Sequence, residues 1–166
     1  DDASTDVVTV NSNKEACSRP RCRFVSNAVN YGRAKNRNAM AELSKGDLLL
    51  IIDCDAKVCR QNFLASYIEA AKGNDVVCGG IAAPNSLPSP DVALRYKYER
   101  NARKVRSLEY RVANPYRHFS TFNVLIRRDV FMEIMFDEKC VEYGYEDALF
   151  GLRLKQRGIH VEHIDN

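Results

Sequence analysis

Hydrophobic and polar positions along the first half of the chain follow two alternating periods. Residues 23–29 (RFVSNAV) have strand composition, residues 32–46 (GRAKNRNAMAELSKG) have helical spacing, and residues 47–53 (DLLLIID) form an apolar run of strand length. The order then repeats, with an amphipathic helix predicted over 60–73 and a short buried strand over 74–80. Strands separated by helices at this spacing predict an α/β fold, with a mostly parallel sheet covered by helices on both faces.

The pattern changes after residue 80. Residues 82–90 hold three of the five prolines and are predicted to form a loop between two halves of one domain. A chain of 166 residues that is 45% hydrophobic and 28% charged is of the size for a single domain over 1–166. It opens on DDAST, which is typical of a loop that follows a strand, and it closes on a strand and a polar turn. We therefore expect the domain to be truncated at both ends.

The sequence also predicts where the protein resides. No apolar run approaches the ~18 to 20 residues that span a bilayer, and no secretory leader begins the chain. These features predict a cytoplasmic protein whose six cysteines are reduced. Cys54 and Cys59 are the pair most similar to a metal clip, but no second pair with zinc spacing accompanies them.

Two aspartates, Asp53 and Asp55, end the apolar run of residues 47–53. In parallel sheets, ligands bind beyond the carboxyl ends of the strands. Carboxylates one residue apart at such an end can converge on a divalent cation, which prefers oxygen ligands and often shares them with substrate phosphates. The alternative is an aspartate that caps the next helix.

Positive charge is concentrated in residues 95–117, which contain eight Lys or Arg residues and two acids. This excess predicts an anionic partner, such as phosphates, a nucleotide or anionic lipid headgroups, with a solvated helical face as the alternative. Tyrosines interleave the charges, but no nucleic-acid-binding motif is present, so nucleic acid is not an expected partner.

A third informative stretch is residues 143–158 (YGYEDALFGLRLKQRG), predicted to form a helix that ends at Gly158. Glu146 and Asp147 lie in its first turn, where acidic side chains match the positive end of the helix dipole. That position also aims a carboxylate rigidly, as a general base requires. Both interpretations stay open on the residues alone.

Together these stretches resemble the family 2 glycosyltransferases, which have the GT-A fold and invert the anomeric centre. The resemblance is carried by DDASTD at the start, by residues 30–55 (NYGRAKNRNAMAELSKGDLLLIIDCD), and by residues 119–154, from FSTFNVLIRRDVF to FDEKCVEYGYEDALFGLRL. It covers nearly the whole chain, and the order of the motifs makes the combination specific. The resemblance implies a nucleotide-sugar-binding half over 1–80 and an acceptor-binding and catalytic half over 91–166.

The resemblance also implies the residues that bind the donor. The acidic pair at the start would contact the base and ribose, and the Arg-Asn pair after the loop glycine would face the nucleotide. A nearby lysine would assist with phosphate, the first acid of the D-x-D would reach the ribose or the metal, and a Thr and an Asn would lie near the sugar. These residues are Asp1, Asp2, Lys35, Arg37, Asn38, Asp53, Thr121 and Asn123.

For the chemistry, the resemblance implies that Asp53 and Asp55 hold Mn²⁺ or Mg²⁺. Asp147 would be the catalytic base, with Glu146 beside it for the acceptor or for positioning. Two features of the family are missing from this chain: the strand and loop that precede the acidic pair, and a metal-binding histidine after the last strand. The histidines present, His118, His160 and His163, are poor substitutes for it.

The expected function is metal-dependent transfer of a sugar from a nucleotide-sugar, by preference a UDP-sugar, to an acceptor hydroxyl with inversion. The expected acceptor is a glycan or a lipid-linked molecule in cell-surface polysaccharide or glycolipid synthesis, at the inner face of the cytoplasmic membrane. Residues 95–117 would then contact the membrane surface. Three alternatives remain: a nucleotidyltransferase of related fold, a non-catalytic module that binds nucleotide-sugars, and a basic membrane-surface adaptor.

Overall fold

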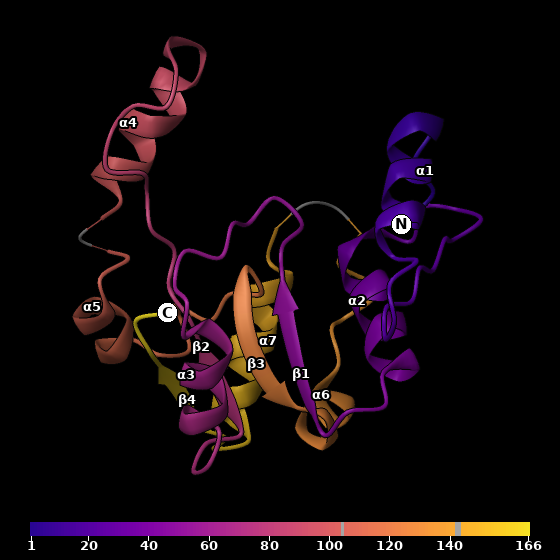
Figure 1. Ribbon diagram of the computed structural model, residues 1–166. Coiled ribbons are helices and arrows are strands. Elements are labelled where there is room, and N and C mark those ends of the chain that lie inside the picture. Colours follow the sequence, from indigo (N-terminus) through magenta and orange to yellow (C-terminus); the bar gives the residue numbers. More distant parts are fainter. Residues whose placement is uncertain (104, 142–143) are drawn as a thin grey trace.

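A mixed four-stranded sheet lies at the centre of the protein in the computed structural model (Figure 1), which describes residues 1–103, 105–141 and 144–166. Its strands follow the order β1-β3-β2-β4 across the sheet. They are β1 (Leu48–Ile52), β2 (Val76–Cys78), β3 (Asn123–Arg127) and β4 (Val161–His163).

The strand directions confirm the α/β fold class and change the expected pairing. β1 and β2 both pair antiparallel with β3, and β2 pairs parallel with β4, so three strands share one direction. The consecutive strands β1 and β2 are nevertheless not neighbours, because β3 lies between them. The first four residues of β3 are buried, as a strand covered on both faces requires. β1 is the first strand in this order and so lies at the edge of the described sheet.

Helices cover both faces of the sheet, as expected (Figure 1). One face packs against α2 (Gly32–Leu43), α6 (Arg128–Ile134) and α7 (Glu146–Gln156), and the other against α3 (Phe63–Ala70). Side chains alternate between the two faces along each strand, so Leu49 joins the larger core while Leu50 lies against the smaller one.

Four phenylalanines dominate the larger core. Phe119 stacks on Phe150 at 4.9 Å between ring centroids, and Phe136 and Phe131 contact the Phe150 ring at 4.7 Å and 5.6 Å. Each such side chain contributes about 1.5–3 kcal/mol when it is fully buried. The cluster joins α6 and α7 to the segment before β3, and so fixes the start of α7 relative to the end of the sheet.

Two helices extend away from the sheet. α1 (Val7–Ala16) and α4 (Ala93–Asn101) have no buried residue, and both project beyond the end of the sheet where β1 terminates (Figure 1). A short 3₁₀ turn, η1 (Pro90–Val92), precedes α4, and α5 (Leu108–Ala113) returns the chain to the sheet. Among the described residues, no helix is both long and apolar enough to cross a membrane.

The sequence-based predictions of local structure hold for most elements, with trimmed ends. The prediction of a strand over residues 23–29 is wrong, because this segment is irregular. Its backbone hydrogen bonds go to the first residue, with the Asp1 amino group donating to Val25 O at 2.8 Å and Asn27 N donating to Asp1 O at 3.0 Å. Strand composition alone does not make a strand where no described neighbour supplies a ladder. Helix α1 was not predicted, because its polar residues follow no clear helical period.

The close approach of α7 to the segment before β3 leads to a stability prediction. A Cβ atom at Gly151 would lie 2.4 Å from Tyr116 O and 3.1 Å from Phe119 Cβ. Gly151→Ala should therefore lower the free energy of unfolding by about 1–3 kcal/mol through overpacking, although alanine is the better helix former by about 1 kcal/mol. Urea unfolding measures this change. Gly73→Ala is the matched control, since nothing lies within 4 Å of its added Cβ. Equal or greater stability of Gly151→Ala would show that α7 does not pack against Tyr116.

Candidate active site

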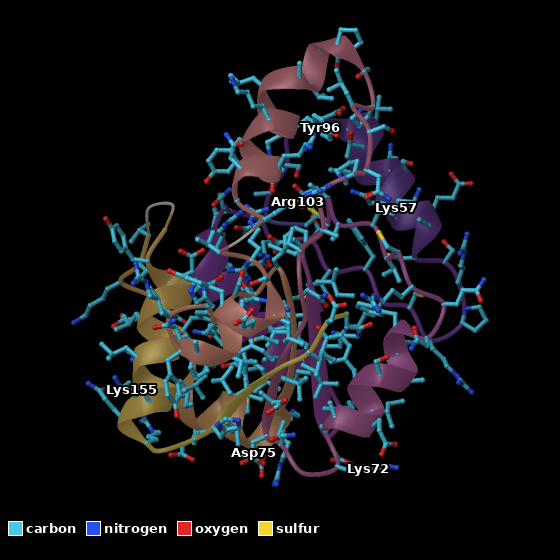
Figure 2. The ribbon with its side chains drawn as sticks, turned by 90° about the vertical axis from the view of Figure 1, so that its left-hand side faces the viewer. Lys57, Lys72, Asp75, Tyr96, Arg103 and Lys155 are labelled. Atoms are coloured by element: carbon cyan, nitrogen blue, oxygen red, sulfur yellow. The ribbon has the colours of Figure 1, made fainter. Side chains whose placement is uncertain are left out.

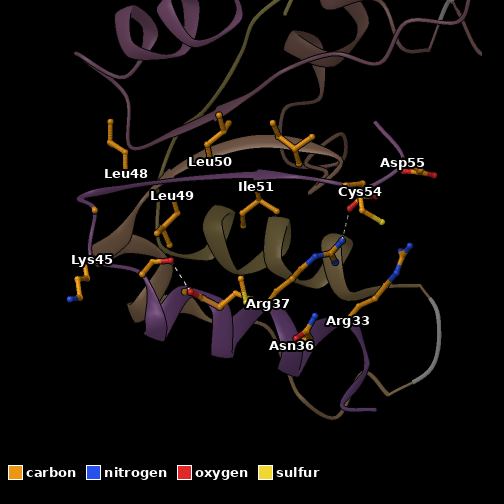
Figure 3. Close-up of a pocket in the computed structure, with 16 residues that line it drawn as sticks. Arg33, Asn36, Arg37, Lys45, Leu48, Leu49, Leu50, Ile51, Cys54 and Asp55 are labelled. Carbon is orange, nitrogen blue, oxygen red and sulfur yellow. Dashed lines mark hydrogen bonds and ion pairs between the residues drawn. The ribbon is translucent and has the colours of Figure 1, made fainter. Parts of the chain in front are cut away.

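Arg37 on α2 brings together carboxylates from two distant parts of the chain. Its Nη2 lies 3.1 Å from Asp53 Oδ1, just past the end of β1. Its Nη1 lies 3.4 Å from Glu146 Oε1 and 3.8 Å from Asp147 Oδ1, in the first turn of α7. Figure 3 shows the Arg37 side chain reaching from the helix toward the end of the strand. The two acidic motifs predicted from the sequence therefore meet at one guanidinium group.

Backbone contacts explain why Asp53 lies where it does. Asp53 N donates to Phe122 O at 3.1 Å, which continues the β1–β3 ladder by one residue, and Asp53 O accepts from Ala56 N in the following turn. At the other motif, Gly144 and Tyr145 have positive φ angles of 105° and 70° directly before α7. Tyr145 is exposed, and a left-handed conformation is uncommon for such a residue. This sharp bend fixes the direction from which α7 begins.

Glu146 is buried and forms ion pairs with two arginines of α2. Its side chain is only 5% exposed, and Oε1 lies 3.4 Å from a guanidinium nitrogen of both Arg33 and Arg37. A buried carboxylate needs such partners, because desolvation of an unpaired charge costs several kcal/mol. Arg33 was not singled out from the sequence. Its spacing of four residues from Arg37 is the signal that places both on one face of α2.

Asp147 has a different environment, although it is the next residue. Thr121 N donates to Oδ2 at 2.9 Å, and Thr121 Oγ1 donates to Oδ1 at 2.8 Å. The Asp147 side chain is 28% exposed, so it is held firmly and still reaches solvent. Adjacent residues of a helix point about 100° apart, which separates the buried Glu146 from the accessible Asp147.

A cavity of about 760 Å³ runs from this acidic end along the edge of β1 (Figure 3). It is lined by α2 on one side and by the strand on the other, and Asp53 and Asp55 lie at its end. Its volume lies within the range that ligand sites of proteins usually occupy.

One comparison with known families identifies the family of this chain. The profile described as Glycosyl transferase family 2 matches residues 1–135. The chain belongs to this family. No curated protein sequence matches the chain.

Solved structures similar to this family 2 chain share its fold at low sequence identity. TarS 1–349 from S. aureus has a TM-score of 0.69 at 17% identity, and covers 100% of this chain and 47% of its own. A mannosyltransferase from Pyrobaculum calidifontis, in complex with GDP-Man and Mn²⁺, has a TM-score of 0.66 at 15% identity. The match covers 100% of this chain and 44% of the mannosyltransferase. Glucosyl-3-phosphoglycerate synthase from Mycobacterium tuberculosis, in complex with phosphoglyceric acid, has a TM-score of 0.58 at 16% identity. The match covers 99% of this chain and 56% of the synthase. The chain thus has the GT-A fold and spans about half the length of these proteins.

The residues of this family 2 chain expected to hold a metal supply two oxygen donors of suitable chemistry. Asp53 and Asp55 follow β1, and Asp55 is exposed beyond the Asp53–Arg37 ion pair (Figure 3). No group of three His, Cys, Asp or Glu side chains that could hold a metal occurs within the described ranges. Two carboxylates nevertheless fit Mg²⁺ or Mn²⁺, because these ions commonly take their other ligands from water and substrate phosphates.

The acidic pair at the start of the chain stabilises the entry to α2. Asp1 Oδ2 accepts from Ser26 Oγ at 3.3 Å. Asp2 accepts from Tyr31 N and Gly32 N, both at 2.9 Å, and so supplies the helix start with the cap that its own residues lack. Burial alone would raise the pKa of Asp2, but the hydrogen bonds outweigh it and hold the pKa below its ordinary value.

Of the other residues expected near the donor, Lys35 is exposed, and Asn38, Thr121 and Asn123 are buried. Lys35 Nζ lies 4.3 Å from the centroid of the Tyr31 ring. Asn38 is only 2% exposed, and its amide binds both the N and the O atoms of Phe136, so in this structure it ties α2 to the end of α6. Thr121 is buried against Asp147, while Asn123 Oδ1 accepts from Tyr67 OH at 2.6 Å.

Proposed function

We propose that this chain is part of an enzyme that transfers a sugar from a nucleotide-sugar to an acceptor hydroxyl, with inversion of the anomeric centre. The observation that carries the proposal is the meeting of Asp53, Glu146 and Asp147 at Arg37, beside a cavity of about 760 Å³. Membership of family 2 supports the reaction class. The arrangement supplies the accessible carboxylate of Asp147 for proton transfer, and the pair Asp53 and Asp55 for the donor.

In this mechanism Asp147 accepts the proton from the acceptor hydroxyl as that oxygen attacks the anomeric carbon. The two hydrogen bonds from Thr121 hold its carboxylate in one orientation, and a positioned base contributes typically 10²- to 10⁴-fold to the rate. Arg37 forms ion pairs with Asp53 and Glu146, which holds the two motifs close together and balances their negative charge. A single displacement on one face of the sugar inverts its configuration.

A divalent cation, Mn²⁺ or Mg²⁺, would be held by Asp53 and Asp55. When bound, it would act as a Lewis acid that stabilises the negative charge developing on the leaving nucleoside diphosphate. The mannosyltransferase complex with GDP-Man and Mn²⁺ supports a requirement of this kind. Asp1, Lys35 and Arg37 remain proposed contacts of the donor nucleotide. Asp2 is proposed to support the donor site through the start of α2, whose backbone it binds.

The proposed donor is a UDP-sugar, and the proposed acceptor is a glycan or a lipid-linked molecule in cell-surface polysaccharide or glycolipid synthesis. Helix α4 supports a position at a membrane surface, because it projects from the sheet (Figure 2) and exposes Leu94 by 84% and Tyr98 by 62%. Lys97 and Arg100 of this helix, and Arg103 just after it, suit anionic headgroups. Lys104, from the same basic segment, lies outside the described residues.

Product analysis tests the reaction class. The protein is incubated with Mn²⁺ and a panel of UDP- and GDP-sugars, with and without candidate acceptors, and the released nucleotide is identified. Release of UDP or GDP with formation of a glycoside of opposite anomeric configuration, seen by NMR, is the expected result. Production of pyrophosphate from a nucleoside triphosphate and a sugar phosphate would instead indicate a nucleotidyltransferase. Tight nucleotide-sugar binding without any turnover would indicate a non-catalytic module.

A further inference from the structure

A second cavity, of about 230 Å³, is lined by both chain neighbours of Thr121, the residue that binds Asp147. Ser120 and Phe122, on either side of Thr121, both line it, and it shares no lining residue with the first cavity. Its polar lining, named here the anion pocket, consists of Arg106, Arg111, Arg117, His118, Ser120 and Asn123. Three of these six residues are arginines, and no acidic residue of the described chain lines the cavity.

Arg111 is a buried cation in the anion pocket that no carboxylate neutralises by direct contact. Its guanidinium donates to Gly79 O at 3.1 Å and to Ile164 O at 2.9 Å, and Nη1 also donates to His163 Nδ1 at 3.0 Å. Among residues 1–103, 105–141 and 144–166, no Asp or Glu forms an ion pair with it. Carbonyl groups accept its hydrogen bonds but carry no full negative charge, and the nearby carboxylate of Asp165 attracts it without direct contact.

His163 holds the Arg111 guanidinium in place and stays neutral. Its Nε2 donates to Pro115 O at 2.9 Å, which leaves Nδ1 as the acceptor for Arg111. Burial lowers the pKa of His163, and the hydrogen bond to Pro115 opposes this effect only in part. Because the histidine is neutral, it fixes the direction of the guanidinium without adding or removing charge.

The lining of the pocket also includes a histidine with a polar atom that has no hydrogen-bond partner in the described chain. His118 Nε2 is buried, and no group of the described chain forms a hydrogen bond with it. The neighbouring Arg117 is exposed and belongs to no ion pair within the described chain. Arg106 is different, because it pairs with Glu99. Arg117 is thus the donor available to an incoming group, and the buried guanidinium of Arg111 adds positive charge beside it.

We propose that the anion pocket binds a phosphate group of the acceptor and so presents the adjoining hydroxyl to Asp147. This inference rests on the proposed function. The cavity volume suits a phosphate or a short phosphorylated chain and is below the range typical of larger ligands, and planar arginine forks match phosphate oxygens in bidentate geometry. The diphosphate of the donor belongs at the separate cavity that Asp53 and Asp55 border.

Titration with simple probes tests the assignment. Inorganic phosphate, glycerol 3-phosphate and glycerol are titrated into the protein, with binding followed by calorimetry or NMR. We expect one saturable site for both phosphates and none for glycerol. Arg117→Gln should weaken phosphate binding about tenfold, the loss typical of one hydrogen bond between charged groups. Lys155→Gln is the matched control, since this exposed lysine loses the same charge at the far end of α7 (Figure 2).

UDP with Mn²⁺ separates this inference from the proposed function. Both Arg117→Gln and His118→Asn should keep the UDP affinity of the unaltered chain, which also verifies that they are folded. Phosphate should bind in the presence of saturating UDP. Competition between phosphate and UDP, or equal phosphate affinity in Arg117→Gln and Lys155→Gln, would overturn the acceptor assignment. Phosphate binding at the anion pocket without any UDP binding would support the pocket as a phosphate site but would contradict the proposed glycosyltransferase function.

Discussion

Asp147→Asn is expected to lower kcat for glycosyl transfer by at least ~10²-fold, the low end of what a positioned base contributes. The substitution keeps the volume of the side chain and can keep one of the two contacts with Thr121, so the fold should persist. Donor affinity should change little, because the loss concerns a proton transfer in the transition state. Steady-state kinetics at saturating donor and acceptor measure the effect.

The control for this prediction is Asp129→Asn, an equal chemical change at an exposed acid in the first turn of α6. It should retain near-native kcat, since a surface ion pair such as that of Asp129 with Arg127 contributes little. Glu146→Gln should mainly lower stability, because it leaves two guanidinium groups beside a buried neutral side chain. If Asp147→Asn kept full kcat while a folded Glu146→Gln lost it, the two roles would be exchanged.

Asp55→Ala is expected to remove at least ~99% of Mn²⁺-dependent transfer, because charge stabilisation by a metal supplies several kcal/mol in the transition state. Asp55 is exposed beyond β1, and no ion pair of the described chain includes it. The melting temperature should therefore stay within a degree or two of the unaltered protein, by the usual rule for surface substitutions. Calorimetric titration of Mn²⁺ in the presence of UDP should show weaker binding in the variant.

Asp75→Ala provides the comparison, since it removes a partly exposed carboxylate at the opposite end of the sheet (Figure 2). Its Mn²⁺ affinity and turnover should match those of the unaltered protein. Unchanged turnover of Asp55→Ala at limiting Mn²⁺ would contradict the metal role and would favour Asp55 as part of a turn before α3.

The elements with strong local signals were predictable from the sequence. Residues 32–46 and 143–158 carry helical spacing with glycine stops, and the structure has α2 and α7 there; of this second stretch, Tyr143 lies outside the described residues. The apolar run of residues 47–53 contains β1 and places Asp53 at its carboxyl end. Local periodicity suffices for these elements because each buries one side in a core, whatever lies opposite. The GT-A resemblance then assigned both acidic motifs to one reaction.

Residues 23–29 and β3 show where local information fails. Both have strand composition, but only Asn123–Arg127 finds partners, with β1 on one side and β2 on the other. Pairing between strands is a long-range contact, so a segment's own residues do not reveal whether a neighbour is available. The same limit explains why the edge position of β1 was not foreseen.

What the sequence by itself determined is the elements around α2, β1, α3, β2 and α7, together with the acidic residues at the end of β1 and the start of α7. Only the tertiary structure decided which partner each acid has: Glu146 is buried against Arg33 and Arg37, and Asp147 is held by Thr121. The anion pocket likewise joins segments around residues 79–81, 105–111 and 117–123. The physical reason is that burial and electrostatic fields depend on distances through space, and residues far apart in the chain set those distances only after the sheet has formed.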